Sequence, residues 1–240
     1  MLARHVRRRS AVARAAVITV VALMVLPVFV VNSFRVLAHD WFVRHELAGG
    51  DFPADRYGLS GSERLDLALT GLRSIRPESE GIVLLERATL PDGSPAFDSR
   101  ELRHMADVRS RLGAAFMAQL GALVILVVAA LAFLRSARWR TVVPRGLLIG
   151  SLATLGVAAL AVPIILLGFD GFFFRFHEIF FSGNSWRFSN TDTLLRIYPE
   201  VFWQDTAQLA AGIVVAQAVV AAGGAALWLH RVRASPGSRP

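Results

Sequence analysis

The sequence predicts an α-helical polytopic membrane protein, with four transmembrane helices and a small α+β extracytoplasmic cap. Hydrophobic residues make up 54% of the 240 residues, and they are gathered into long runs. Four runs reach the ~20 apolar residues that a helix needs to cross a hydrocarbon core of ~30 Å. None of the four contains a charged residue, which excludes an ordinary soluble domain. The predicted spans are Ala15–Phe34, Leu112–Leu134, Gly146–Phe169 and Ala207–Leu229.

Arginine is unevenly distributed among the five segments between and beyond these spans. Residues 1–14, 135–145 and 230–240 together carry 12 of the 26 arginines and no Asp or Glu. All 18 carboxylates fall in residues 35–111 and 170–206. Because arginine in short loops is retained in the cytoplasm, the three basic segments are predicted to be the cytoplasmic N-terminus, loop and tail. The other two segments are predicted to lie outside, in a multi-pass protein of the cell membrane.

Composition narrows the possible functions. The net charge of +8 is compatible with nucleic-acid binding, but the twelve inner arginines are typical juxtamembrane charges attracted to anionic lipid. We therefore expect membrane lipids, and no nucleic acid, as partners. The chain has no Cys, which excludes disulfides and thiol chemistry.

The first span has two interpretations. Basic residues, an apolar run and Val36-Leu37-Ala38 resemble a signal peptide with its cleavage site. The apolar run is longer than a usual signal-peptide core, which favours a retained span. The sequence leaves both interpretations open.

Capping and turn signals divide the segment 35–111. Ser60-Gly-Ser-Glu63 has the form of a capping box and predicts a helix near 61–74. The short apolar run 82–85 predicts a strand, and the turn residues of Leu90-Pro-Asp-Gly93 predict a hairpin. Asp98-Ser-Arg-Glu101 is a second capping box, so we expect a helix that begins there and continues into the second span.

The segment 170–206 is predicted to be irregular. Residues 182–185 form a turn signal, and Asn190-Thr-Asp192 can cap a short helix that Pro199 stops. In the third span, the two glycines of Gly146-x-x-x-Gly150 permit close helix packing.

Two of the six histidines, His104 and His177, lie just outside a predicted span on the same side of the membrane. Asp107 shares a helix face with His104 and can orient the imidazole, although a polar face of a juxtamembrane helix has the same pattern. His177 lies among the phenylalanines of Phe172–Phe181, which mark the level of the lipid headgroups. Those rings can seat acyl chains or anchor the segment, and the sequence does not separate these roles.

Two motifs carry a family resemblance. They are Glu101-Leu-Arg-His104-Met-Ala-Asp107-Val and Phe176-His-Glu-Ile-Phe-Phe181, followed by Trp186, Asp192 and Tyr198-Pro-Glu-Val-Phe202. In these motifs and in its four spans the chain resembles the bacterial four-span membrane proteins that include the lipoprotein intramolecular transacylase. The resemblance implies an acyltransferase acting on a diacylglyceryl lipoprotein. Such an enzyme moves the sn-2 acyl chain of the diacylglyceryl-cysteine to the α-amine of that cysteine, leaving a lyso-form lipoprotein.

The resemblance also implies the site residues. His104 and His177 correspond to the two family histidines thought to be catalytic, one as base on the amine and the other acting on the carbonyl or the departing oxygen. Their order stays open. We expect supporting or substrate-binding roles for six further residues: Asp107, Glu178, Asn184, Trp186, Arg187 and Asp192. The metal-binding motif H-E-x-x-H is absent, and no metal or other cofactor is predicted.

Two other functions are compatible with a four-span membrane protein. A non-enzymatic membrane scaffold or accessory protein with an extracytoplasmic cap is the alternative. Transport is disfavoured because the predicted spans contain no ionisable residue, which a permeation path usually needs.

Overall fold

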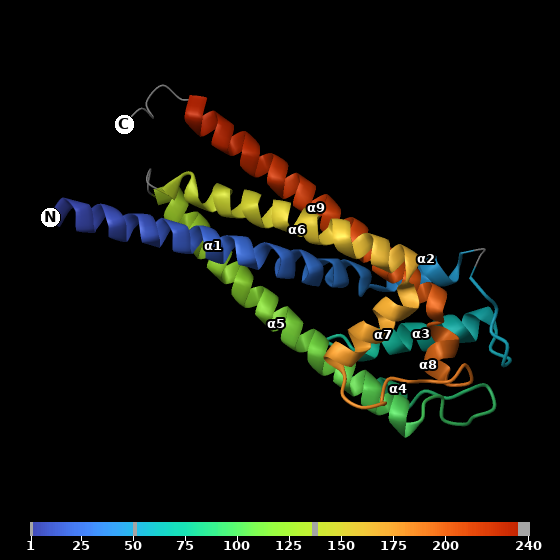
Figure 1. Cartoon of the computed structure of the whole chain (residues 1–240). Coiled ribbons are helices and arrows are strands. Elements are labelled where there is room, and N and C mark those ends of the chain that lie inside the picture. The colour runs from blue at the N-terminus through green and yellow to red at the C-terminus, as the bar shows by residue number, and fades with distance from the viewer. Residues whose placement is uncertain (1, 50–51, 136–138, 235–240) are drawn as a thin grey trace. The chain divides into compact units, whose positions relative to one another are not determined.

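The computed structural model describes residues 2–49, 52–135 and 139–234. Over these ranges the chain is nearly all helical (Figure 1). Its helices are α1 (Leu2–Leu37), α2 (Asp40–Leu47), α3 (Gly61–Ser74), α4 (Val83–Glu86), α5 (Ser99–Arg135), α6 (Val142–Leu167), α7 (Phe169–Phe180), α8 (Thr193–Ile197) and α9 (Glu200–Ala234).

The four longest helices confirm the prediction of four membrane-spanning segments. Each contains a stretch long and apolar enough to cross a bilayer. These stretches are Arg8–Leu37, Ser99–Ala132, Val142–Leu167 and Glu200–Ala234. Parts of the predicted cytoplasmic loop 135–145 and tail 230–240 lie outside the described residues.

The chain divides into two compact units. Unit 1 consists of Met1–Ser33, Ala118–Val162 and Ala210–Pro240, and unit 2 of Phe34–Met117 and Pro163–Leu209. The helices α1, α5, α6 and α9 contribute to both units. Both histidines of interest belong to unit 2.

In unit 1, glycines allow α6 to approach α1 closely. A Cβ atom at Gly146 would lie 2.7 Å from the Cβ of Val21, and one at Gly150 would lie 2.7 Å from the carbonyl oxygen of Ala22. Both distances are shorter than real side chains show, so only glycine fits. The close packing predicted from these two glycines is therefore confirmed.

Polar side chains also connect helices within unit 1. The amide of Asn32 on α1 donates to the side-chain oxygen of Gln217 on α9 at 2.8 Å. The Gln217 amide in turn donates to the carbonyl oxygen of Phe29 at 3.3 Å. Such bonds satisfy polar groups that hydrocarbon would leave without partners.

In unit 2, both capping boxes are present. Ser60 accepts a hydrogen bond from the backbone N–H of Glu63, and the Glu63 carboxylate accepts one from the backbone N–H of Ser60. Asp98 and Glu101 make the equivalent pair at the start of α5, at 2.8 Å in both directions. The helices begin at the residues that these signals predicted.

The predicted strand is wrong. Residues 82–85 fall in the short helix α4 and the turn that leads into it, with Leu85 fully buried. A run of four apolar residues does not distinguish a strand from a buried helical turn. The predicted hairpin is reduced to a turn at Leu90–Gly93 and one isolated bridge between Thr89 and Pro95, so the described part of the cap has no strand.

The region 170–206 is more regular than predicted. The phenylalanine-rich segment forms a twelve-residue helix, α7. The short helix α8 follows the predicted cap Asp192 and ends at Ile197, two residues before Pro199. Tyr198 is buried after α8, where its hydroxyl donates to the carbonyl oxygen of Ala68 on α3.

Candidate active site

His104 lies in the second turn of α5, close to the helix start. The capping box at Asp98 and Glu101 sets that start, so it also sets the direction in which His104 projects. The side chain is only 8% exposed. A ring this buried depends on its surroundings, and not on water, for hydrogen-bond partners.

His177 lies in the last turn of α7, half-buried. Its Nδ1 atom is 2.8 Å from the carbonyl oxygen of Phe173, one turn earlier. A carbonyl oxygen can only accept a hydrogen bond, so Nδ1 carries the proton and the neutral ring keeps its lone pair on Nε2. Burial lowers the pKa of His177, and the bond to the Phe173 carbonyl offsets part of that shift.

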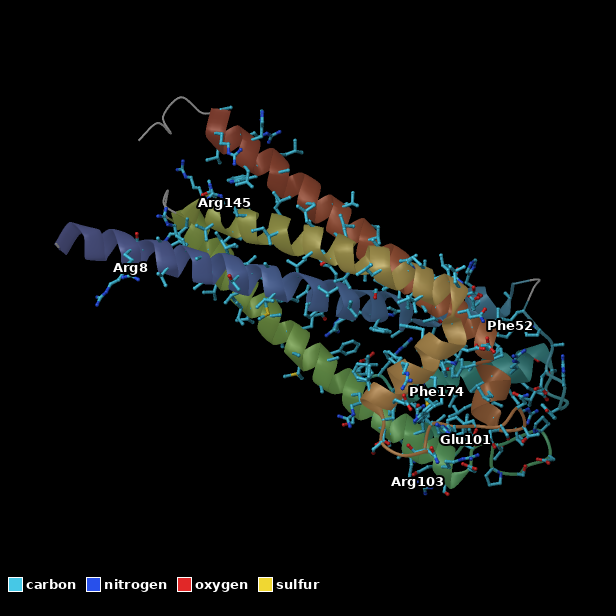
Figure 2. All side chains as sticks on the ribbon, viewed as in Figure 1. Arg8, Phe52, Glu101, Arg103, Arg145 and Phe174 are labelled. Atoms are coloured by element: carbon cyan, nitrogen blue, oxygen red, sulfur yellow. The ribbon has the colours of Figure 1, made fainter. Side chains whose placement is uncertain are left out.

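The two imidazoles face one another. Their ring centroids are 6.2 Å apart and their planes differ by 26°. Phe174 and Glu101, labelled in Figure 2, mark α7 and α5, the helices that carry the two rings. Two histidines 73 positions apart in the sequence are thus brought together within unit 2.

Aromatic side chains surround this pair. The centroid of Phe181 is 4.9 Å from that of His104 and 5.5 Å from that of His177. Phe188 packs on His104 at 5.3 Å, and Trp186 lies 4.9 Å from His177 with the two ring planes tilted by 31°. The two imidazoles therefore lie in a low-dielectric environment, where hydrogen bonds and the interactions between charges are stronger than in water.

Three buried polar atoms near the pair have no hydrogen-bond partner within the described ranges. They are Nδ1 of His104, Oγ of Ser185 and Nε1 of Trp186. A buried donor or acceptor left unpaired destabilises a protein by about 1–3 kcal/mol. Such atoms at an aromatic-lined histidine pair are suited to receive the polar groups of a ligand.

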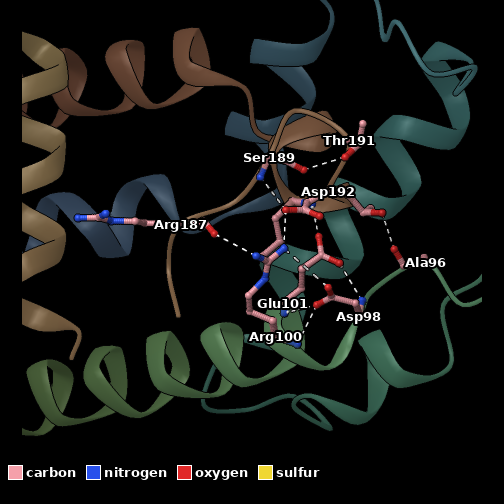
Figure 3. A network of polar contacts seen from close by, with 10 residues as sticks. Ala96, Asp98, Arg100, Glu101, Arg187, Ser189, Thr191 and Asp192 are labelled. Carbon is pink, nitrogen blue, oxygen red and sulfur yellow. Dashed lines mark hydrogen bonds and ion pairs between the residues drawn. The ribbon is translucent and has the colours of Figure 1, made fainter. Parts of the chain in front are cut away.

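A polar network behind the histidines holds α5 against the segment 187–194 (Figure 3). Arg100 donates to a carboxylate oxygen of Asp192 at 2.7 Å and to the carbonyl oxygen of Arg187 at 3.3 Å. Glu101 is only 3% exposed and accepts from the backbone N–H of Leu194 at 2.8 Å. The network fixes α5 three residues before His104.

The predicted supporting residues separate into two groups. Trp186 contacts His177, and Arg187 lies over the rings of Phe174 and Trp186 at 4.8 and 5.3 Å. Asp107 acts on His104 through its charge, and the remaining three make no interaction with the imidazole pair in the described structure. Asp107 and Asn184 are exposed, Glu178 pairs with Arg175 at 2.8 Å, and Asp192 belongs to the Arg100 network.

Sequence reasoning gave no role in the site to Glu101, Ser185 or the ring of Phe188. The capping-box pattern identifies the bond between Glu101 and Asp98. No local pattern identifies the second bond, from Leu194, because its donor lies 93 positions away. Among the described residues no group of three or more His, Cys, Asp or Glu side chains could hold a metal ion.

Two hollows in unit 2 lie away from the histidines. One of about 470 Å³ is lined by α5 residues such as Ala106 and Gly113, which lie on a different face of that helix from His104. The other, of about 330 Å³, is lined by Asp170, Glu200 and Gln204, among others. Neither is lined by an imidazole, so these hollows do not form the site.

Comparisons with known proteins agree with this arrangement. The sequence model of the family "Lipoprotein intramolecular transacylase Lit" matches residues 79–203, which include both histidines. An uncharacterized protein of Aquifex aeolicus is 34% identical over 173 residues, or 72% of this chain and 76% of that protein.

Solved structures share the fold. The membrane integral lipoprotein intramolecular transacylase from Bacillus cereus superposes with a TM-score of 0.77 at 19% identity, covering 94% of this chain and 100% of that one. A form of that enzyme in which one histidine is replaced by alanine gives a TM-score of 0.71, covering 94% and 97%. With the family match over more than half of the sequence, the chain belongs to the lipoprotein intramolecular transacylase family.

Proposed function

We propose that this protein is a membrane acyltransferase that moves the sn-2 acyl chain of a diacylglyceryl-cysteine lipoprotein to the α-amine of the same cysteine. The product is an N-acyl, S-monoacylglyceryl lipoprotein. The observation that carries the proposal is the enclosed pair of His104 and His177, 6.2 Å apart, in a chain of this family.

The reaction needs a base. An α-amine has a pKa of ~7.7–8.0, so at neutral pH most of it is ammonium, which is not nucleophilic. A histidine with a free ring nitrogen can remove the proton, and general-base help typically contributes ~10²–10⁴-fold. His177 suits this role because its Nδ1 is committed to Phe173, which leaves Nε2 as the acceptor.

His104 then acts on the ester and not on the amine. Its Nδ1 has no partner in the described structure, so it is available to the ester carbonyl or to the departing glyceryl oxygen. Amine and ester belong to one substrate molecule, so holding them in contact contributes further, on the order of 7–11 kcal/mol at best. No acyl-enzyme is needed, consistent with a sequence that has no Cys and no G-x-S-x-G motif.

The predicted orientation fits this substrate. With both termini in the cytoplasm, the histidine pair lies on the extracytoplasmic side, where lipoproteins are anchored. Arg187, and more distantly Asp107, Glu178, Asn184 and Asp192, are proposed to meet the headgroup or support the site. The phenylalanines around the imidazoles would contact the acyl chains.

Mass spectrometry of a lipoprotein's N-terminal peptide tests the proposal. Cells with the intact protein should yield the N-acyl, S-monoacylglyceryl peptide, and cells without it the free-amine diacylglyceryl peptide. His104→Ala and His177→Ala should abolish the conversion while the protein remains inserted in the membrane. His45→Ala, at an exposed position of unit 2, is the matched control and should convert normally. An unchanged diacylglyceryl terminus with the intact protein would leave the non-enzymatic scaffold as the explanation.

A further inference from the structure

The indole of Trp186 is buried among aromatic rings, yet its packing does not account for its N–H. The side chain is only 8% exposed, and its ring lies 4.9 Å from the His177 ring at an angle of 31°. Phe174 meets it edge-on at 5.1 Å. Its Nε1 is buried without a partner in the described structure. Apolar packing alone would be served by phenylalanine, which carries no buried N–H.

The chemistry of that atom defines its partner. An indole N–H can only donate, whereas the other two unpaired atoms of the site, on His104 and Ser185, can donate or accept. The missing partner of Trp186 is therefore an acceptor, such as a carbonyl oxygen or an oxyanion. Because the indole is always a donor, its hydrogen bond does not depend on pH.

We propose that the N–H of Trp186 donates to the carbonyl oxygen of the sn-2 ester and stabilises the oxyanion that forms there. This inference rests on the proposed transacylation. Donors that are already in place and aimed at developing charge in a water-poor site are among the largest contributors to acyl transfer. The stacking on His177 holds the donor beside the base, as attack by the amine on that carbonyl requires.

The step balances without another reactant. The amine nitrogen attacks the ester carbon, one amine proton passes to Nε2 of His177, and the carbonyl electron pair moves onto oxygen. The oxyanion then re-forms the carbonyl, and the carbon–oxygen bond to glycerol breaks. The glyceryl oxygen takes up the proton that the amine released, directly from His177 or by way of His104, so that both imidazoles return to their neutral forms. An amide and a free hydroxyl result. Trp186 keeps its proton throughout.

Replacement of the single N–H tests the proposal. Trp186→3-benzothienylalanine puts sulfur in place of N–H and keeps the two-ring shape, so stacking on His177 is preserved. With a purified enzyme and a synthetic diacylglyceryl lipopeptide, kcat should fall by ~10²–10³-fold and KM should change little. Trp203, whose ring is 6.2 Å from that of Phe173, is the matched control. The same replacement there should leave kcat within about twofold.

A second measurement is made on the enzyme with its natural tryptophan. With ¹⁵N-labelled indoles, the N–H proton of Trp186 should move downfield when the intact enzyme binds an analogue with an sn-2 amide, which keeps the carbonyl but reacts slowly. The signal is assigned by its absence in Trp186→Phe. An unshifted signal, full kcat in the benzothienyl variant, or an equal loss at Trp203 would each overturn the role. Absence of transfer by the wild-type enzyme would instead overturn the proposed function.

Discussion

The Oε1 atom of Glu101 accepts a hydrogen bond of 2.8 Å from the backbone N–H of Leu194, which joins the start of α5 to α8. Its Oε2 atom accepts another, also 2.8 Å, from the backbone N–H of Asp98. One buried carboxylate thus satisfies two backbone donors from separate parts of unit 2. His104 follows one turn later on α5.

Glu101→Ala should destabilise the protein by about 1–3 kcal/mol for each buried donor that loses its acceptor. Transacylation should also fall, because the start of α5 loses its bond to α8. Thermal unfolding in detergent, followed by tryptophan fluorescence, measures the first effect. Asp66→Ala, at an exposed position of α3, is the control and should leave Tm unchanged. Equal Tm values for the two variants would contradict the structural role of Glu101.

The pH dependence of kcat/KM, which reports the free enzyme, should show the lowered pKa of His177. If its neutral form is the base, activity is present above this pKa and is lost as pH falls through it. Because the pKa lies below the ordinary value of ~6.5, the acid limb should appear below about pH 6.5. Rates of the wild-type enzyme, measured with the synthetic lipopeptide, test this. A wild-type rate that stays constant as pH falls below about 6.5 would contradict this assignment.

The carboxyl groups of Glu46 and Asp205 should make the folded protein less stable as pH rises. Burial raises the pKa of Glu46 to about 7, together with the hydrogen bond that its protonated carboxyl donates to Asp205 and the repulsion between the two charges. The folded protein therefore holds a proton that the unfolded chain releases near pH ~4.3, so this contribution to stability is lost as pH rises from about 4.3 through 7. Glu46→Gln should raise Tm at pH 8 and leave it nearly unchanged at pH 4. Glu78→Gln, at an exposed position, should change Tm at neither pH.

Two Gly→Ala substitutions on α6 should have different effects on Tm, because the added Cβ would meet α1 at one position and nothing within 4 Å at the other. Gly150→Ala should lower Tm, because its Cβ would lie 2.6 Å from a Val25 methyl and 2.7 Å from the Ala22 carbonyl oxygen. At Gly156, on the same helix, an added Cβ meets nothing within 4 Å. Gly156→Ala should therefore be neutral or slightly stabilising. Identical thermal shifts for the two variants would contradict the close approach of α6 to α1.

Patterns formed by residues that are close together in the sequence predicted the structure correctly. Apolar runs longer than the bilayer core predicted the four long helices, and the boxes at Ser60 and Asp98 predicted where α3 and α5 begin. The strand prediction failed because four apolar residues at 82–85 have no period that separates strand from helix. The helix α7 was missed although its apolar residues recur at helical spacing and most of its phenylalanines share one side.

The histidines of the site could be identified from sequence, but their surroundings could not. His104 and His177 stood out as titratable residues beside spans on one side of the membrane. Contacts such as Phe188 with His104, and Leu194 with Glu101, join residues more than 80 positions apart and follow only from the folded chain. Asp192 is predicted to support the site, and its carboxylate bonds Arg100, a partner 92 positions away that no local pattern identifies.

The hydrogen bond from His177 to Phe173 lies entirely within one helix, α7. The donor, Nδ1 of His177, and the acceptor, the carbonyl oxygen of Phe173, therefore move together when the helix moves. Should entry of a bulky, two-tailed molecule push α7 aside, the imidazole would travel with it and still present Nε2. The position of the proton on Nδ1 of His177 is thus independent of how far α7 moves.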